Sequence, residues 1–224
     1  MKIAVIGAKG KLGSSITNEL HTCGHEVIEI DKINQSEHQD WSNADAAIDA
    51  SHHKNTLSVA KTCKRSGIPL LVACTGHSAK ELSKIKKTLD SVPHEFCPNL
   101  SAGMNFVFET LALVPQDFLI SATIFEQHHK TKKDTPSGTA KHLKNIVDEI
   151  SQTPTEIVSS RFSKALGTHK ITLEFLDETV TIEHNIRSRN AFAMGAVKKI
   201  ENLKNCQGNL DVMSDITGQN HEQN

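Results

Sequence analysis

Short apolar runs alternate with segments of helical periodicity through the first hundred residues. Residues 2–6 form a β-branched run that leads into a glycine turn, and Leu12, Ile16 and Leu20 follow at helical spacing. The same alternation predicts strands at 26–30, 46–48, 70–73 and 95–97, with helices over 55–66 and 78–89. Strands joined through helices by short links form right-handed crossovers in a parallel sheet. The sequence therefore predicts an α/β fold that opens with a doubly wound parallel sheet.

The pattern changes after residue 100. A helix over 101–113, a strand over 119–126 and a helix over 137–150 precede two alternating runs at 170–176 and 179–186. The two runs are separated by two acidic residues, which is typical of a hairpin in an antiparallel or mixed sheet. This part of the chain is predicted to be a separate α+β domain.

Two domains follow from this change of pattern. Residues 1–100 are expected to form the first domain, and a last helix over 190–205 is expected to return to it, so that 190–224 completes it. Residues 101–189 are expected to form the second domain.

Composition narrows the class of protein. Over 224 residues the formal net charge is −1, and no basic block suggests a nucleic-acid partner. No apolar run is long enough for a signal peptide or a membrane span, and five cysteines without a Cys-x-x-Cys pair favour reduced thiols, so we expect a cytoplasmic protein. The chain contains no tyrosine, which excludes a Tyr-x-x-x-Lys proton relay.

The first strand is followed by a Gly-x-x-Gly-x-x-Gly turn, residues 7–13. In this context glycines permit a tight turn, and the helix N-terminus offers amides to a pyrophosphate, as in Rossmann-type sheets. The alternative is a turn of purely structural use. Asp31 at the end of the second strand favours the ribose of NAD, whereas Lys32 and Lys11 favour the extra phosphate of NADP, so NADH and NADPH both stay open.

Titratable side chains concentrate in residues 126–140, a loop between a strand and a helix. His128 and His129 are candidates for proton transfer, because imidazole titrates near neutrality. A metal site is disfavoured, since adjacent residues on a strand point to opposite faces and no further ligand spacing completes a set. The amides at 137–139 begin a helix and suit a carboxylate, although Pro136 and Ser137 equally suit an ordinary helix start.

These segments resemble one family. Residues 126–140 are similar to the signature of 4-hydroxy-tetrahydrodipicolinate reductases, in which two histidines precede a lysine and then Asp-Ala-Pro-Ser-Gly-Thr-Ala. Residues 7–13 and 97–105 resemble its Gly-Ala-x-Gly-Arg-Met-Gly and Ala-Pro-Asn-x-Ser-x-Gly-x-Asn motifs. Residues 161–169 and 189–197 follow its C-terminal pattern, and 209–213 faintly echoes its closing motif, so the resemblance spans nearly the whole chain.

The sequence departs from the family at two strand ends and in length. Asp49-Ala50-Ser51 stands in place of Asp-Phe-Thr, and Ala73-Cys74-Thr75-Gly76 in place of Gly-Thr-Thr-Gly. The region between Lys32 and Trp41 is shorter than in most members. The changes at the strand ends bear on cofactor affinity more than on the reaction.

The resemblance implies reduction of 4-hydroxy-tetrahydrodipicolinate, a cyclic imine dicarboxylate, to tetrahydrodipicolinate with NADH, NADPH or both, in diaminopimelate and lysine biosynthesis. It implies that His128 is the acid/base group and Lys132 the assisting cation, that His129 binds substrate, and that Ser137, Gly138, Thr139 and Arg189 hold a carboxylate. It also implies a homotetramer, in which residues 1–100 with 190–224 form the dinucleotide-binding domain and residues 101–189 form the substrate-binding and oligomerisation domain. The cofactor-binding residues expected from the family are Gly7, Ala8, Lys9, Gly10, Lys11, Leu12, Asp31, Lys32, Ser51, Ala73, Cys74, Thr75, Cys97, Pro98, Asn99 and Leu100.

Three other functions compete with this one. An oxidoreductase with another substrate would share the architecture, but residues 128–139 argue against it. A non-catalytic nucleotide sensor would have no need of His128, His129 and Lys132 together. A metal hydrolase lacks convincing ligands.

Overall fold

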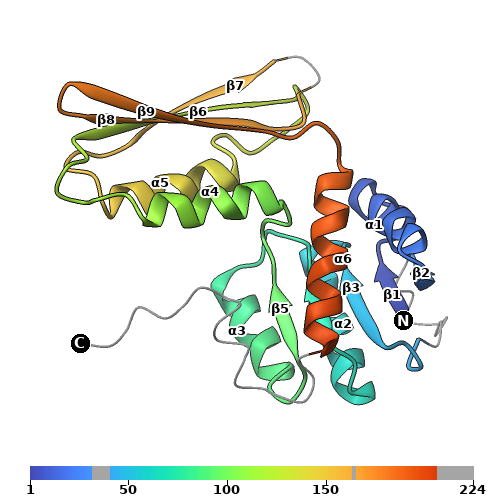
Figure 1. Cartoon of the computed structure of the whole chain (residues 1–224). Coiled ribbons are helices and arrows are strands. Elements are labelled where there is room, and N and C mark those ends of the chain that lie inside the picture. The colour runs from blue at the N-terminus through green and yellow to red at the C-terminus, as the bar shows by residue number, and fades with distance from the viewer. Residues whose placement is uncertain (32–40, 163–164, 206–224) are drawn as a thin grey trace. The chain divides into compact units, whose positions relative to one another are not determined.

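The computed structural model describes residues 1–31, 41–162 and 165–205 and forms two compact units (Figure 1). Unit 1 contains Met1–Leu100 together with the chain from Phe192, and unit 2 contains Ser101–Ala191. Within the described ranges, no helix is long and apolar enough to cross a membrane.

Unit 1 is built on a five-stranded parallel sheet with strand order β2-β1-β3-β4-β5. This confirms the doubly wound sheet predicted from the sequence. Its strands are β1 (Lys2–Ile6), β2 (Glu26–Ile30), β3 (Ala46–Asp49), β4 (Leu70–Val72) and β5 (His94–Phe96). Its helices are α1 (Lys11–Thr22), α2 (His53–Ser66), α3 (Ala79–Thr88) and α6 (Asn190–Asn205), of which α6 begins just before the boundary of the unit.

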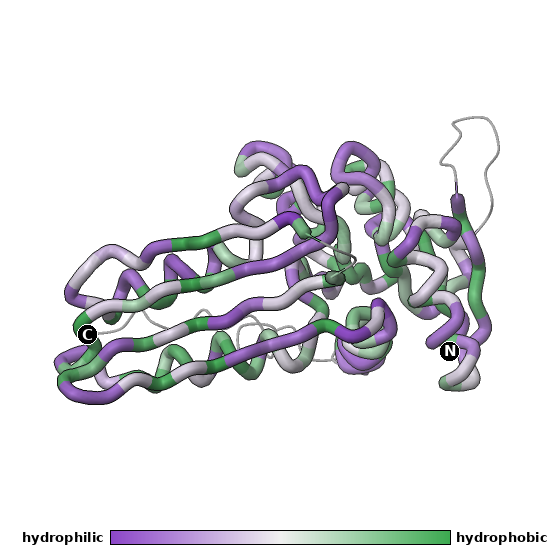
Figure 2. Tube along the Cα trace, turned by 90° about the horizontal axis from the view of Figure 1, so that it is seen from above, coloured by the Kyte–Doolittle hydropathy of each residue, from purple (hydrophilic) through white to green (hydrophobic). Residues whose placement is uncertain are grey.

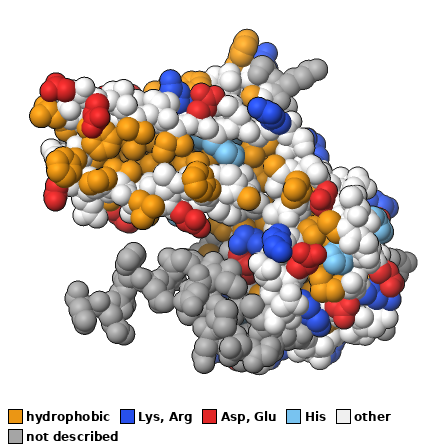
Figure 3. Space-filling view, in the orientation of Figure 1, with side chains coloured by type: hydrophobic (Ala, Val, Ile, Leu, Met, Phe, Trp, Pro, Cys, Tyr) orange, Lys and Arg blue, Asp and Glu red, His pale blue; other side chains and the backbone are white. Residues whose placement is uncertain are grey.

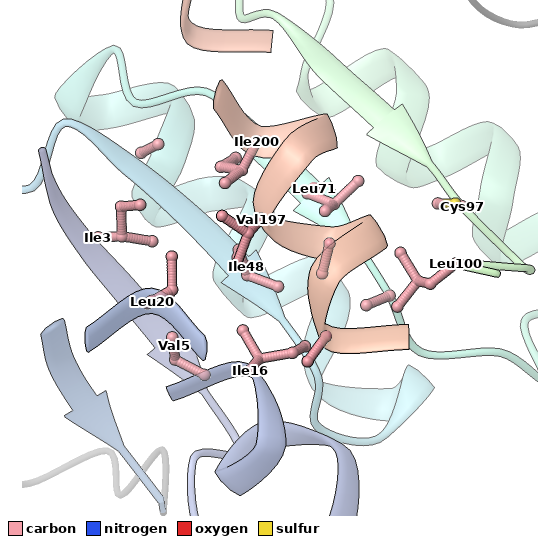
Figure 4. Packing of buried hydrophobic residues seen from close by; sticks show 14 of the residues in the cluster. Ile3, Val5, Ile16, Leu20, Ile48, Leu71, Cys97, Leu100, Val197 and Ile200 are labelled. Carbon is pink, nitrogen blue, oxygen red and sulfur yellow. The ribbon is translucent and has the colours of Figure 1, made fainter. Parts of the chain in front are cut away.

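Helix α6 packs on the same face of this sheet as α1. Figure 4 shows Val197 and Ile200 of α6 beside Ile48 and Leu71 of the central strands, all of them fully or almost fully buried. Gly195 makes this packing possible, because a Cβ there would lie 1.8 Å from the carbonyl oxygen of Leu100. The last helix is therefore part of the unit 1 core.

Unit 2 is a four-stranded mixed sheet of order β7-β6-β8-β9, covered on one face by two helices (Figure 1). Strand β6 pairs parallel with β7 and antiparallel with β8, which pairs antiparallel with β9. This confirms the predicted mixed or antiparallel sheet. The elements are α4 (Ala102–Ala112), β6 (Ser121–His128), α5 (Gly138–Asp148), β7 (Glu156–Arg161), β8 (Thr168–Phe175) and β9 (Glu178–Asn185).

Two features of unit 2 differ from the sequence prediction. Strand β7 was not predicted, because Ile157 and Val158 are its only large apolar residues and its second half is polar. Strand β6 runs two residues further than expected and ends at His128. Since alternate residues of a strand share a face, Glu126 and His128 point to the same side.

The strands of unit 2 alternate in hydropathy along their length (Figure 2). Ala122, Ile124, Ile171 and Leu173 point toward the helices and form the core with residues of α4 and α5. The buried row of β6 then continues through Glu126 and His128, which are 0% and 7% exposed. The apolar half of the sheet thus fixes the direction of the polar half, where the candidate site lies.

Candidate active site

The glycine turn after β1 has a backbone that other residues cannot adopt easily. Gly7 has a φ of +82°, and a Cβ there would lie 2.8 Å from the carbonyl oxygen of Ala50 and from the Cα of Ser51. At Gly13 a Cβ would lie 2.0 Å from the carbonyl oxygen of Gly7. Glycine is required at both positions, so the turn closes tightly against the end of β3.

Helix α1 begins without a side-chain cap. Its N-cap is Gly10, no side chain of the described chain caps it, and its first turn contains no acidic residue. Helices α2, α3, α4 and α5 are each capped by a side chain, from His52, Ser78, Ser101 and Ser137 respectively. Uncapped amides and the positive end of a helix dipole suit an anion, so α1 fits the pyrophosphate of a dinucleotide.

A buried carboxylate lies at the end of β3, beside this turn. Asp49 accepts hydrogen bonds from the amide and the hydroxyl of Ser51, and the Cys74 thiol lies 3.7 Å from its other oxygen. Burial and the charge of Asp49 raise the pKa of Cys74 to about 12. Cys74 is therefore a neutral thiol, and the altered strand ends form one connected polar group.

The other expected cofactor residues lie mostly along the same edge of the sheet. Ala8, Ala73, Cys97 and Leu100 are buried, and burial raises the pKa of Cys97 to about 11. Leu12, Ser51, Cys74 and Asn99 are partly exposed, whereas Lys9, Gly10, Lys11, Asp31, Thr75 and Pro98 are exposed. Lys32, which bears on the choice of cofactor, lies outside the described residues.

In unit 2 the candidate site is organised around Glu126, a fully buried carboxylate on β6. Its Oε1 accepts hydrogen bonds from the Ser137 amide at 3.1 Å, the Ser159 hydroxyl at 2.8 Å and the Arg161 guanidinium at 2.8 Å. Burial alone would raise the pKa of Glu126, but these hydrogen bonds outweigh it and hold the pKa at about 2. Glu126 is ionised throughout the physiological range.

Two imidazoles lie on the other side of this carboxylate. His128 Nδ1 lies 3.2 Å from Glu126 Oε2, and His169 Nε2 lies 4.0 Å from the same oxygen. Burial lowers the pKa of both histidines, that of His169 to about 4, despite the opposing charge of Glu126. Both rings are therefore neutral at pH 7. Gly167 lies against them, since a Cβ there would come within 3.2 Å of His128 Nε2.

Lys132 and His129 follow on the loop after β6 and are partly exposed. Lys132 Nζ forms an ion pair of 2.9 Å with Asp134, and His129 Nδ1 lies 2.7 Å from the Thr131 hydroxyl. Lys132 is close enough for its charge to lower the pKa of His128, although burial is the larger cause. Arg189 is partly exposed, and within the described residues no hydrogen bond or ion pair joins it to these side chains.

The backbone amides at the helix start 137–139 have partners within unit 2. The Ser137 amide donates to Glu126 and its hydroxyl caps the Ala140 amide. The Gly138 amide hydrogen-bonds to Asp134 and lowers the pKa of that carboxyl, together with Lys132 and against the effect of burial. The carboxylates bound at this helix end are thus the protein's own Glu126 and Asp134.

Glu126, His128 and His169 also bring three ligand atoms within 4.8 Å of one another, a spacing that a metal ion accepts. From the sequence a metal was disfavoured because His128 and His129 point to opposite faces and no further ligand spacing completes a set, whereas the fold brings Glu126 and His169 to His128. The cations of Arg161 and Lys132, which lower the pKa of His128, oppose a divalent ion at this place. The geometry alone would allow a metal, but the charges around it do not favour one.

Three residues of this cluster received no role from the sequence: Glu126, Arg161 and His169. Glu126 stands two residues before His128, so the period of a strand could have paired them if β6 had been extended correctly. Arg161 and His169 come from β7 and β8, more than thirty residues further along the chain. Nothing local to residues 126–140 indicates them.

The two units define the class of the protein: a Rossmann-type parallel sheet with a glycine turn, joined to a mixed-sheet unit that contains a buried carboxylate–imidazole cluster. The family model described as "Dihydrodipicolinate reductase, N-terminus" matches residues 1–100, and the family model described as "Dihydrodipicolinate reductase, C-terminus" matches residues 103–216. The chain belongs to the dihydrodipicolinate reductase family, as its motifs indicated. The family is one of oxidoreductases that use a nicotinamide dinucleotide.

Curated relatives agree with this assignment. A 4-hydroxy-tetrahydrodipicolinate reductase of Staphylococcus aureus is 29% identical over a match that covers 92% of this chain and 95% of the relative's chain. One of Caldanaerobacter subterraneus is 29% identical over 77% of this chain and 76% of the relative's chain. Among solved structures, a dipicolinate-bound dihydrodipicolinate reductase from Paenisporosarcina sp. TG-14 has a TM-score of 0.77 at 16% identity over 92% of this chain and 95% of that chain. An aspartate dehydrogenase from Thermotoga maritima has a TM-score of 0.55 at 11% identity over 91% and 96%. These structural matches concern the fold.

Proposed function

We propose that this protein reduces 4-hydroxy-tetrahydrodipicolinate to tetrahydrodipicolinate with NADH or NADPH, in the pathway to diaminopimelate and lysine. The observation that carries the proposal is the Glu126–His128 pair, with Lys132 on the adjoining loop, in a chain of this family. Water must leave the substrate and a proton must return to it, and a neutral imidazole beside a cation is suited to both transfers.

His128 is the group that moves the proton. As a neutral base it removes a proton from the ring carbon between the hydroxyl-bearing carbon and the imine carbon, and the hydroxyl leaves as water. Lys132 supplies the proton that this leaving group needs and regains one from solvent. A nicotinamide dinucleotide, when bound, would supply the hydride that ring carbon four receives. His128 then returns its proton to the neighbouring carbon, and because burial lowers its pKa, the imidazolium is a strong enough acid to do so.

The substrate carboxylates are bound by cations and by the start of α5. Lys132 and the Gly138 amide now hold Asp134, and a substrate carboxylate competes for the same donors. Thr139, one residue further along the helix, belongs to the same group. His129 and Arg189 are proposed to contact the substrate from the loops on which they lie.

We propose that the dinucleotide binds unit 1 with its pyrophosphate at the turn 7–12, where α1 offers uncapped amides. Ser51, residues 73–75 and residues 97–100 would contact its nicotinamide half, and Asp31 and Lys32 its adenosine ribose. Both NADH and NADPH are candidates.

The decisive assay follows the absorbance of NADH and NADPH separately while dihydrodipicolinate synthase produces the substrate in situ. Substrate-dependent oxidation of either cofactor is the expected result, and it also gives the preference between them. A folded protein that binds nucleotide but oxidises neither cofactor would refute the proposal in favour of a sensor or an enzyme with another substrate. Aspartate is the first alternative substrate to test, given the fold neighbour.

We further propose a cytoplasmic homotetramer assembled through unit 2. Among the residues that the structure describes, no helix covers the sheet face opposite α4 and α5, and Val158 on that face is 44% exposed. Phe106 of α4 and Val180 of β9, which lie on the side of the sheet that the helices cover, are 67% and 45% exposed, and Figure 3 shows apolar side chains gathered along unit 2. Light scattering on the eluting protein measures the assembly, and a monomer at micromolar concentration would contradict it.

A further inference from the structure

The two oxygens of Glu126 have different surroundings. Oε1 accepts from the Ser137 amide, the Ser159 hydroxyl and the Arg161 guanidinium, which come from α5 and β7. Oε2 is buried and has no hydrogen bond within the described chain. Its neighbours are His128 Nδ1 at 3.2 Å and His169 Nε2 at 4.0 Å. The three donors hold the carboxylate in one orientation, with its second oxygen directed at the imidazoles.

His128 Nδ1 is likewise buried and lacks a hydrogen bond of good alignment. A buried imidazole nitrogen 3.2 Å from a carboxylate oxygen is stabilised when it carries the proton, because a lone pair in its place would face a negative charge. Hydrogen bonds between catalytic groups are often poorly aligned before substrate binds. The pair therefore favours the tautomer with hydrogen on Nδ1.

We infer that Glu126 is a positioning residue, which fixes the Nδ1–H tautomer of His128 and leaves Nε2 as the nitrogen that exchanges protons with substrate. The inference rests on the proposed function for what the proton does, but not for which nitrogen carries it. Neither the expected roles from the sequence nor the family assignment gives Glu126 a part in the reaction.

The charges around His128 agree with a neutral ring. The groups that face it are Glu126 on its own strand, Lys132 and Asp134 on the following loop, Arg161 on β7 and His169 on β8. Two carboxylates and two cations nearly balance, so burial decides the direction of the pKa shift. Since the ring carries one proton at pH 7, its position on Nδ1 or Nε2 decides whether Nε2 can act as a base.

The test is Glu126→Gln, which keeps the shape and reverses the hydrogen-bonding character of the second oxygen. The new glutamine's amide oxygen accepts from Ser159 and Arg161, so its NH₂ group faces His128 and donates to Nδ1. The imidazole proton of His128 must then lie on Nε2. We expect kcat to fall about 100-fold to 10,000-fold, in the range known for a carboxylate that orients a catalytic histidine, with KM changed by less than about threefold. Glu201→Gln makes the same change in a carboxylate 3.0 Å from His25 Nε2, a histidine with no assigned role, so it is the matched control and should retain kcat within about threefold.

Nitrogen-15 NMR of the imidazoles reads the tautomer without any substrate. The expected result is Nδ1–H for His128 in the unaltered protein and Nε2–H in Glu126→Gln, with His128→Gln used to assign the signal. An Nε2–H tautomer in the unaltered protein overturns the inference, even if the variant does not fold. So does a folded Glu126→Gln variant with unchanged kcat. If the unaltered protein shows Nδ1–H but no reductase activity, the proposed function fails and the positioning by Glu126 stands.

Discussion

Gly167→Ala tests the candidate site by crowding His128 without touching any charged group. A Cβ at this position would lie 3.2 Å from His128 Nε2, 3.5 Å from its Cδ2 and 3.9 Å from His169 Cε1. Ordinary carbon contacts lie at about 3.5–4.0 Å, so the ring must withdraw by a few tenths of an ångström. Because β6 and the core behind it are packed, the ring moves rather than the strand.

The expected consequences differ for stability and for rate. Overpacking costs about 1–3 kcal/mol, and the loss of glycine's freedom in the unfolded chain offsets about 0.4–1 kcal/mol of this, so we expect about 1 kcal/mol of destabilisation. A displaced proton-transfer group loses rate steeply, since an error of about 1 Å can cost about 100-fold. For a smaller shift we expect kcat to fall about 10-fold to 30-fold with KM little changed.

Gly103→Ala is the matched control. Its Cβ would lie at the same 3.2 Å from a histidine nitrogen, but from His184, which has no assigned role in proton transfer. Initial rates at saturating substrate, together with urea unfolding of both variants, separate the two effects. If Gly167→Ala retained full kcat, or if Gly103→Ala lost as much, His128 would not be the proton-transfer group.

Three other perturbations test separate parts of the molecule. Gly7→Ala should raise the KM for the dinucleotide at least 10-fold, because its Cβ would lie 2.8 Å from backbone atoms of Ala50 and Ser51; unchanged cofactor binding by calorimetry would place the pyrophosphate elsewhere. Lys132→Ala should lower kcat at least 100-fold with intact folding, and near-normal turnover in the same coupled assay would remove its role. The free energy of unfolding should fall as the pH decreases from about 6.5 to 2. In the folded protein His169 and Glu126 have pKa values of about 4 and 2, so the unfolded chain takes up protons at these two residues before the folded chain does, and each residue contributes about 3 kcal/mol. A melting temperature that is constant from pH 7 to 4 would contradict this.

The sequence predicted unit 1 well because each of its elements is defined locally. Buried parallel strands are continuous apolar runs, and the glycine turn follows the first of them, so pattern and motif agree. Strand β7 was missed for the opposite reason. Its Ser159 and Arg161 are polar residues that face inward to hold Glu126, and a hydropathy pattern cannot show that partner.

The candidate site was predicted in part for a related reason. His128, His129 and Lys132 were found because they are close together in sequence and match a motif. The carboxylate that holds His128 and the second imidazole beside it depend on the register of β6 with β7 and β8, in which His128 pairs with Arg161 and Glu126 with His169. The two-residue error in the end of β6 and the missed strand β7 together hid this arrangement.

The register of unit 2 also explains why one carboxylate can serve both the structure and the reaction. Parallel pairing of β6 with β7 brings Ser159 and Arg161 to Glu126, and the Ser137 amide reaches it from the start of α5. Glu126 Oε1, on β6, therefore accepts hydrogen bonds both from β7 and from the start of α5, the helix end proposed to bind substrate. The other oxygen is then fixed relative to that helix end, and so is His128. A change in how the substrate carboxylate is bound at α5 would reach His128 through Glu126, so the proposed substrate binding and the proposed proton transfer are coupled through one carboxylate.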